Sequence, residues 1–315
     1  MAAGNPQRRW RGLGGPVGLL VPGARDAITD VPGVRVGHAQ AASGEHTGVT
    51  VVAPPSLPAL AGVATVNGTG ELTAKLEIDE VGSMETPIYL CGTHATGTVM
   101  QAAVLASGRG PDDVVIPVVG ECDDGDMADS RTVTGVDVDA ALAALGPEVA
   151  EGSVGAGTGM SCYGFPGGIG TASRTVGDYV VGVLLLCNFG DRAYLDVLPD
   201  AARAPANGGG DGSCIAVCAT DAPLAPHQLR RLALRPLLGL ARTGSYAQEG
   251  SGEIGIAFST SPAAGLLNTE LNGYFAAAYE CAQEAVYNCL VAARPARRRD
   301  GTMQEAFPVD ELAAS

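Results

Sequence analysis

The run YVVGVLLLCN, residues 179–188, constrains the fold more than any other segment of this 315-residue chain. It is apolar almost throughout and lacks the polar–apolar alternation that marks a strand with one face in water. A strand of this kind lies in a sheet that is covered on both faces. With further strand-like runs at 169–175, 213–220 and 251–260, it predicts a layered α/β sandwich around a largely buried pair of sheets.

Helices are expected mainly in the last third of the chain. One is predicted over 225–242, kinked at Pro236, and the longest is predicted over 269–293. Shorter helices are expected over 96–106 and from Asp137, which is a suitable N-terminal cap. The predicted strands nevertheless outnumber the helices.

Three segments show no periodicity. The first 25 residues are interpreted as an irregular arm, residues 191–212 as a long surface loop, and the segment from Arg294 onward as a loose tail. The chain has no internal repeat and no clear linker. We therefore expect one domain over residues 1–315.

Net charge and composition limit the classes of molecule that this chain is expected to bind. The formal charge is 19 − 34 = −15, which repels phosphate backbones and argues against nucleic acid. Arg8 and Arg9 faintly resemble a twin-arginine export signal, but Gly and Pro interrupt the apolar stretch that follows. No segment is as apolar and long as a transmembrane helix. We expect no membrane partner and a cytoplasmic location.

No cofactor or metal site is expected. The motif GAGTGM at 155–160 resembles part of a dinucleotide fingerprint, but no strong strand precedes it and no helix follows. The cysteines form no CxxC pair and most lie in apolar runs, which is typical of buried thiols in a reducing compartment. They are Cys91, Cys122, Cys162, Cys187, Cys214, Cys218, Cys281 and Cys289.

Ser213 stands on the border between a glycine-rich loop and an apolar strand, in the sequence GGGDGSCIAVCAT. It is either an ordinary strand-opening residue or the first residue after a break in the chain. A break between Gly212 and Ser213 would give one residue both a hydroxyl and an α-amine, which titrates near neutral pH. Such a residue supplies nucleophile and base together. Glycine at 212 suits a self-cleavage that distorts the backbone.

Three further residues could support this chemistry. Ser251 and Glu253 are two apart in a strand, so their side chains share one face and could hold an ammonium group. Asn188 ends the longest buried strand and could donate to an oxyanion. Each could also be an ordinary polar residue at a strand end. His227, at the start of the 225–242 helix, stays open as an alternative base.

These features together resemble the DmpA-type family of self-processing aminopeptidases. The family comprises L-aminopeptidase/D-esterase and β-peptidyl aminopeptidase enzymes, with nylon-oligomer hydrolases as relatives. The resemblance covers nearly the whole chain and rests on long, ordered motifs. These are AITDVPGVRVGH (27–38), TGVTVV (47–52), VNGTGELT (66–73), ETPIYL (85–90), GTGMSCYGFPGGIGTASR (157–174), LLLCNFG (184–190), DGSCIAVCATDAPLAPHQLRRLA (211–233) and GLARTGSYAQEGSGEIGIAFST (239–260).

The resemblance implies a four-layer αββα sandwich of the N-terminal-nucleophile type. It implies a cut between Gly212 and Ser213 that yields chains 1–212 and 213–315, with Ser213 as nucleophile. Ser251 and Glu253 match the family's paired serine and glutamate, and Asn188 matches its oxyanion asparagine. Members of the family release N-terminal residues from peptides, amides or esters, usually without metal, and form homo-oligomers, often tetramers of processed heterodimers.

One turn departs from the family pattern. Where relatives often carry a tyrosine that helps stabilise the oxyanion, this chain reads DDGDMADS with Asp126 at that place. An ionised carboxylate cannot donate a hydrogen bond, so Tyr163 is a candidate substitute, although a packing role is the simpler interpretation. Glu121 and Asp126, with Asp123 and Asp124, could instead bind a substrate ammonium. A solvated acidic turn explains them equally well.

Three rival functions follow from the same features. Acyl transfer to an amine occurs in enzymes of related fold, but these use threonine in a different motif. Hydrolysis of non-peptide amides or esters needs the same residues. A non-catalytic binding homologue would follow if Asp126 had destroyed the oxyanion site.

Overall fold

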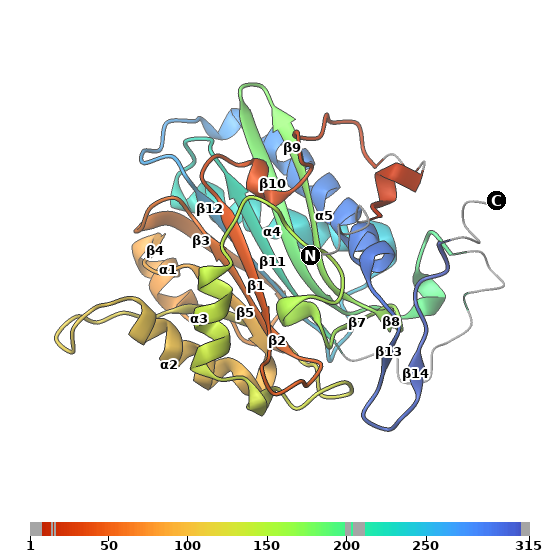
Figure 1. Ribbon diagram of the computed structural model, residues 1–315. Helices are drawn as coiled ribbons and strands as arrows, with labels where there is room; N and C mark the ends of the chain where they lie inside the picture. Colours follow the sequence, from red (N-terminus) through yellow and green to blue (C-terminus); the bar gives the residue numbers. More distant parts are fainter. Residues whose placement is uncertain (1–7, 14, 16, 199–202, 204–211, 310–315) are drawn as a thin grey trace.

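A computed structural model describes residues 8–13, 15, 17–198, 203 and 212–309. Within them, two sheets stack face to face and helices cover their outer faces (Figure 1). The loop expected over 191–212 falls largely outside the described residues.

The larger sheet has six strands in the order β4-β3-β12-β11-β10-β9. All neighbouring pairs are antiparallel except β11 and β12, which are parallel. The strands predicted at 169–175, 179–188, 213–220 and 251–260 are confirmed to within one residue at each end. The bounds are β3 Ala59–Asn67, β4 Ser83–Met84, β9 Gly168–Val176, β10 Tyr179–Asn188, β11 Ser213–Thr220 and β12 Gly252–Ser259.

The smaller sheet has four strands in the order β1-β2-β5-β6. Its strands are β1 Arg35–Gln40, β2 Gly48–Ala53, β5 Ile88–Gly92 and β6 Val118–Cys122. Two two-stranded ribbons lie outside both sheets. They are β7 Ser161–Cys162 with β8 Phe165–Pro166, and β13 Ala296–Arg297 with β14 Met303–Gln304.

The helices α4 and α5 contact the larger sheet, and α2 and α3 contact the smaller one (Figure 1). The α-helices are α1 Lys75–Val81, α2 Thr96–Ala106, α3 Gly135–Ala143, α4 Pro226–Leu240 and α5 Asn272–Ala292. Short 3₁₀ turns occupy Trp10–Leu13, Ile28–Asp30, Thr93–Ala95, Ser130–Thr132, Gly155–Gly157, Arg192–Tyr194, Ala241–Thr243 and Asn268–Glu270.

Two details differ from the sequence-based expectations. The helix α3 begins at Gly135, so Asp137 lies inside its first turn and not at the cap; its carboxylate accepts from the Thr134 backbone N–H at 2.8 Å, as in a capping box. The helix α1 was not predicted, because seven residues following a glycine turn show too little periodicity.

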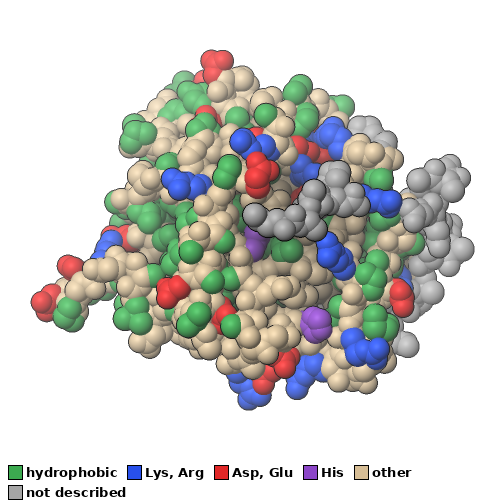
Figure 2. Space-filling model, viewed as in Figure 1, with side chains coloured by type: hydrophobic (Ala, Val, Ile, Leu, Met, Phe, Trp, Pro, Cys, Tyr) green, Lys and Arg blue, Asp and Glu red, His purple; other side chains and the backbone are tan. Residues whose placement is uncertain are grey.

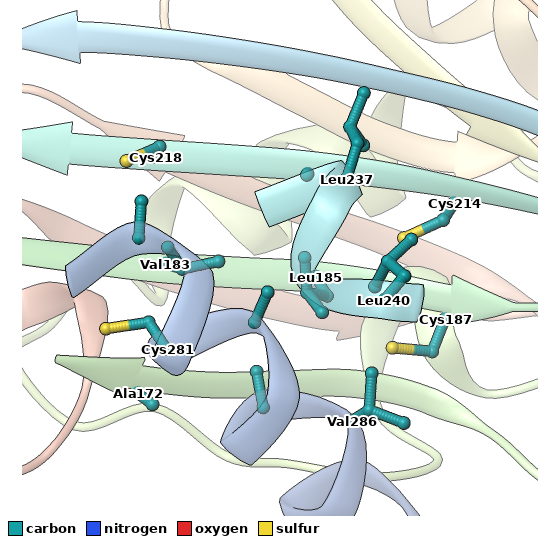
Figure 3. Packing of buried hydrophobic residues seen from close by; sticks show 14 of the residues in the cluster. Ala172, Val183, Leu185, Cys187, Cys214, Cys218, Leu237, Leu240, Cys281 and Val286 are labelled. Carbon is teal, nitrogen blue, oxygen red and sulfur yellow. The ribbon is translucent and has the colours of Figure 1, made fainter. Parts of the chain in front are cut away.

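Strand β11 shows why the central strands are apolar along their whole length. Cys214 and Cys218 belong to the core under α4 and α5 (Figure 3). Ile215 and Val217 alternate with them and pack into the layer between the two sheets. Because both faces of the strand are covered, its interior is apolar, and its polar residues Ser213 and Thr220 stand at its two ends. The predicted four-layer αββα sandwich is the architecture observed.

The end of the chain is not the loose tail that the sequence suggested. The ribbon of β13 and β14 folds back on the body, and Phe307 is buried with its ring 5.4 Å from that of Phe165. Two-residue strands in an arginine-rich segment leave no periodic pattern, so this docking was not visible in the sequence.

Figure 2 shows one face of the molecule with side chains coloured by type. On the described part of the face in Figure 2, acidic and basic side chains are intermixed and no continuous basic patch is seen. None of the described helices combines the length and the apolar character that crossing a bilayer requires.

Candidate active site

Ser213 is the first residue of β11 and lies between two other candidate segments. In the sheet it pairs with Asn188, the last residue of β10, and on its other side with Gly252. Gly252 is the residue between Ser251 and Glu253. The structure therefore brings all four predicted residues to the same end of the six-stranded sheet.

The Ser213 hydroxyl is buried without a conventional hydrogen-bond partner among the described residues. The residue is only 4% exposed. The Cys122 thiol, a weak hydrogen-bonding group, lies beside it: burial raises the pKa of this thiol, and contact with the Ser213 hydroxyl opposes that rise. Leaving a buried hydroxyl unpaired costs about 1–3 kcal/mol, and such cost is typical of a group that acts on a ligand.

Gly212 is held in a place that only glycine can occupy. A Cβ atom added there would lie 2.2 Å from the Asn188 carbonyl oxygen, far inside van der Waals contact. The Gly212 carbonyl oxygen accepts from the Gly252 N–H at 3.1 Å. Close approach of backbones, added to the conformational freedom expected from the sequence, thus explains glycine before Ser213.

Ser251 and Glu253 form a buried pair. The Ser251 hydroxyl donates to Glu253 Oε1 at 2.5 Å, in agreement with the shared face inferred from their spacing. Glu253 Oε2 is buried without a partner among the described residues. Burial raises the pKa of this carboxyl, and the Ser251 hydrogen bond opposes that rise. An acidic oxygen left open in the strand segment that pairs with the start of β11 suits an ammonium group.

The Asn188 side-chain amide is fixed by two contacts. Its Oδ1 accepts from the Ser161 N–H at 2.9 Å, and its Nδ2 donates to the Asp123 carbonyl at 2.8 Å. The opposite amide orientation would place N–H against N–H and oxygen against oxygen. One hydrogen on Nδ2 therefore stays free to donate elsewhere.

Asn67 is a residue at this site that the sequence reasoning did not single out. It ends β3 and pairs with Glu253 in the sheet. Its Nδ2 donates to the carbonyls of Gln248 and Glu249 at 2.7 and 3.1 Å, which holds the turn that leads into Ser251. Its place in the VNGTGELT motif was the one available signal.

The acidic candidates occupy different environments. Glu121 is buried, and its two oxygens accept from the Glu71 N–H at 2.8 Å and from the Thr93 hydroxyl. A Cβ added at Gly70 would lie 3.3 Å from Glu121 Oε1 and 3.8 Å from the Gly252 Cα, so Glu121 is close to the Ser213 end of the sheet. Asp126 is exposed.

Tyr163 is a buried residue with a positive φ of 52°. Its hydroxyl forms a 2.8 Å hydrogen bond with the Thr243 hydroxyl, and burial strongly raises the pKa of the phenol. Its ring packs against Phe189 in an edge contact at 5.5 Å. These contacts support the packing interpretation of Tyr163.

His227, the alternative base, does not lie at this end of the sheet. His227 is exposed near the start of α4, which follows the end of β11 opposite Ser213. Seven steps along a strand at about 3.3 Å each separate the two ends of β11. Among the described residues, no group of three or more His, Cys, Asp or Glu side chains could hold a metal ion.

Comparison with known proteins identifies the family. The family model for peptidase family S58 matches residues 26–304. The chain belongs to this family. The match confirms the resemblance inferred from the motifs, and with it the prediction that the chain is a peptidase.

Relatives and solved structures agree with this membership. The chain is 40% identical to the "Beta-peptidyl aminopeptidase BapA" of Sphingosinicella microcystinivorans, over 97% of this chain and 91% of that relative. It matches the "Burkholderia sp. beta-aminopeptidase" with TM-score 0.90 and 38% identity over 98% of each chain. It matches the L-aminopeptidase D-Ala-esterase/amidase of Ochrobactrum anthropi with TM-score 0.83 and 35% identity over 97% of each chain. That structure is described as a prototype serine aminopeptidase with a variant of the Ntn hydrolase fold, which agrees with the predicted fold class.

Proposed function

We propose that this peptidase is a self-processing serine aminopeptidase that cuts itself between Gly212 and Ser213. The observation that supports this most is the position of Ser213. It opens β11 with a buried hydroxyl that has no conventional hydrogen-bond partner among residues with described positions, and it pairs in the sheet with Asn188 and with the residue between Ser251 and Glu253. The products would be chains 1–212 and 213–315, which stay together as one sandwich because β10 and β11 pair along their length.

Self-cleavage begins with attack of Ser213 Oγ on the Gly212 carbonyl carbon. The C–N bond to Ser213 breaks as the new ester bond forms, and the hydroxyl proton passes to the departing amine. Water then hydrolyses the ester, leaving a carboxylate on Gly212 and a free α-amine on Ser213. Ser213 pairs in the sheet with Gly252, the neighbour of Glu253, and we propose that the open oxygen of Glu253 orients and charge-balances this amine.

Substrate hydrolysis repeats the chemistry on a new acyl group. The Ser213 amine accepts the hydroxyl proton while Oγ attacks the substrate carbonyl, and the free N–H of Asn188 Nδ2 donates to the oxyanion. The amine returns the proton to the leaving group. Water, activated by the same amine, releases the acyl group, so the cycle needs no cofactor.

The substrates would be small peptides, amides or esters with a free N-terminal amine. Two related proteins are named for action on β-amino acyl substrates, and we extend that class to this chain. Glu121, close to the site, and the exposed Asp126 are the acids proposed to receive the substrate ammonium. We further propose a cytoplasmic homo-oligomer of processed heterodimers, tetrameric as in the family resemblance.

A denaturing gel combined with turnover of aminoacyl nitroanilides tests this proposal. The 31.6 kDa chain should give two smaller bands, and Ser213→Ala should remain intact and inactive. Ser213→Thr keeps a hydroxyl and should still split. A single intact band without turnover would favour a non-catalytic binding protein. If the Ser213→Ala variant still splits at Gly212, Ser213 is not the nucleophile of the self-cleavage.

Asp126 offers a separate test of the oxyanion site. If the departure at this turn weakens stabilisation of the oxyanion, Asp126→Tyr should raise kcat several-fold, because a phenol donates where a carboxylate repels. The measurement is kcat on the split protein, with Asp112→Tyr, an exposed change elsewhere, as the control. Unchanged or lower activity would show that the turn does not limit the rate.

A further inference from the structure

The two contacts that orient the Asn188 amide come from segments far apart in the sequence. Ser161 lies in the β7–β8 ribbon and Asp123 directly follows β6. The β7–β8 ladder is only two residue pairs long, and Asp123 lies just beyond the end of the β5–β6 ladder. The Tyr163 N–H ties the first of these segments to the Phe189 carbonyl at 2.8 Å. Any further contact to the two segments bears on the angle at which the amide is held.

The ribbon of β13 and β14 contacts both segments. Gln304 Nε2 donates to the Ser161 hydroxyl oxygen at 2.9 Å. On the other side, the Arg299 N–H donates to the Asp126 carbonyl at 3.0 Å, and Arg299 Nη1 donates to the Gly125 carbonyl at 3.3 Å. Figure 1 shows this ribbon beside β7 and β8. One short hairpin thus spans both supports of the amide.

Gln304 is an unusual residue for its position. It is only 2% exposed, and its Oε1 is buried without a hydrogen-bond partner among the described residues. A buried amide with one unpaired end is unfavourable for stability. Its neighbour Met303 is 47% exposed. A polar residue is therefore buried, and an apolar one exposed, at the place where the hairpin contacts Ser161.

The hairpin itself is anchored independently of Gln304. The Arg298 N–H donates to the Thr302 carbonyl at 2.8 Å across the turn. Beyond β14, Phe307 packs on Phe165, which lies in β8 opposite Cys162. Loss of the Gln304 hydrogen bond should therefore loosen the contact to Ser161 without releasing the hairpin.

We propose that Gln304 is a positioning residue for the oxyanion donor, acting on Asn188 through Ser161. The inference rests on the role given to Asn188 in the proposed function. Gln304 lies in the segment 213–315, whereas Ser161 and Asn188 lie in 1–212. After the cut, the smaller chain would thus orient the oxyanion donor of the larger chain as well as supplying the nucleophile.

The test is a double-mutant cycle on the full chain, measured as kcat and KM after splitting. Gln304→Met keeps the side-chain volume but removes the hydrogen bond to Ser161. It should lower kcat about tenfold with KM unchanged, because a misplaced Asn188 amide stabilises the oxyanion less than a well-placed one. Ser161→Ala, which keeps the backbone N–H to Asn188, should lower kcat equally. Combining these two changes should add nothing further.

Repeating Gln304→Met in an Asn188→Ala variant tells whether its effect on kcat comes from the position of the Asn188 amide or from a general loss of stability. There, Gln304→Met should have no further effect on kcat, because the amide that it orients is gone. Met303→Ala, on the exposed side of the same strand, is the matched control and should match the wild type. If Gln304→Met fails to fold, Ser161→Ala carries the same comparison.

Two results would overturn the inference in distinguishable ways. Unchanged kcat in Gln304→Met, or an equal loss with and without Asn188, would remove the positioning role and leave the proposed function intact. Unchanged kcat in Asn188→Ala would remove the oxyanion role itself, and the positioning role with it.

Discussion

Two buried polar regions of this protein differ in whether their polar atoms have hydrogen-bond partners. Around Arg174, which is fully buried, the guanidinium contacts three carboxylates and two backbone carbonyls. These are Glu284 at 2.6 Å, Glu280 at 3.2 Å, Asp26 at 3.3 Å, and the carbonyls of Ser173 and Val17, each at 2.8 Å. Around Ser213, by contrast, the Ser213 hydroxyl and Glu253 Oε2 are buried, and neither has a conventional hydrogen-bond partner in the part of the chain that the structure describes.

The pKa values of Glu284 and Glu253 shift in opposite directions, whereas burial and the neighbouring Glu284 raise the pKa of Asp26 to about 6. Burial acts to raise the pKa of Glu284, but hydrogen bonds and charge from Arg11 and Arg174 hold it below its ordinary value. Burial raises the pKa of Glu253, and one hydroxyl opposes that rise only in part. Paired charges hold the N-terminal arm to α5. Under the proposed function, the open oxygen of Glu253 would receive the amine of the cut chain or of a substrate.

The largest effect is expected at the paired region. Arg174→Met should destabilise the fold by about 3–5 kcal/mol, because it removes the buried cation that Asp26, Glu280 and Glu284 share and leaves only the half-buried Arg11 beside Glu284. Urea unfolding at neutral pH measures this. Arg109→Met, which breaks the half-exposed pair with Glu85, should cost at most about 1 kcal/mol. Equal losses in the two variants would mean that the buried network contributes no more than a surface pair.

Around Ser213, replacing a charged side chain by a neutral one should not lower the free energy of unfolding as it does at Arg174. Glu253→Gln can still accept from Ser251 but loses the charge that holds the amine, so kcat should fall about 100-fold, equivalent to about 2.7 kcal/mol. Stability should stay equal or rise, since an uncompensated buried charge is removed. Glu249→Gln, exposed in the preceding turn, is the control. A large loss of stability in Glu253→Gln would show that the Glu253 charge stabilises the fold, as the charges around Arg174 do.

His38 extends the comparison to pH. Burial lowers the pKa of this histidine to about 4; its Nδ1 lies 3.0 Å from the Thr50 hydroxyl, and its Nε2 has no described partner. The unfolded chain binds a proton below about pH 6.5, and the folded chain only near pH 4. The free energy of unfolding should therefore decrease as pH falls through this window.

The variant His38→Asn isolates that contribution. Its loss of stability between pH 6.5 and 4 should be smaller than that of the wild type by about 2 kcal/mol. The measurement is urea unfolding across this pH range, with the exposed His46→Asn as control. Parallel pH profiles for wild type and His38→Asn would show that His38 does not take part in acid destabilisation.

The smallest effect is expected at Tyr163, whose buried hydroxyl is hydrogen-bonded to the Thr243 hydroxyl. Tyr163→Phe removes the hydrogen bond to Thr243 and should cost about 1 kcal/mol of stability with kcat within about twofold. Thermal unfolding and turnover are measured together, with the exposed Tyr194→Phe as control. A tenfold fall in kcat at unchanged stability would assign Tyr163 to substrate binding after all.

Much of the fold was predictable from local patterns. Uninterrupted apolar runs marked β10 and β11, and a spacing of two placed Ser251 and Glu253 on one face, where they now share a hydrogen bond. The polar residue at the start of β11 was also visible as an anomaly. Such features follow from strand periodicity, which is a property of neighbouring residues and needs no tertiary information.

Other features depended on segments that meet only in the folded chain. The Gly212 position is restricted by the Asn188 carbonyl, and the Asn188 amide is oriented by Ser161 and Asp123. Gln304 contacts Ser161 from 143 positions further along the sequence. Side-chain hydrogen bonds over such separations leave no periodic trace.

The sequence by itself therefore determined which strands are buried, where the chain has an anomalous serine, and which family it resembles. The tertiary structure decided which polar atoms are paired and which are left open, and it docked an apparent tail against Ser161 and the turn at Asp126. The physical reason is that periodicity encodes which face of an element is buried. The pairing of a buried polar atom depends on what the rest of the chain brings to it.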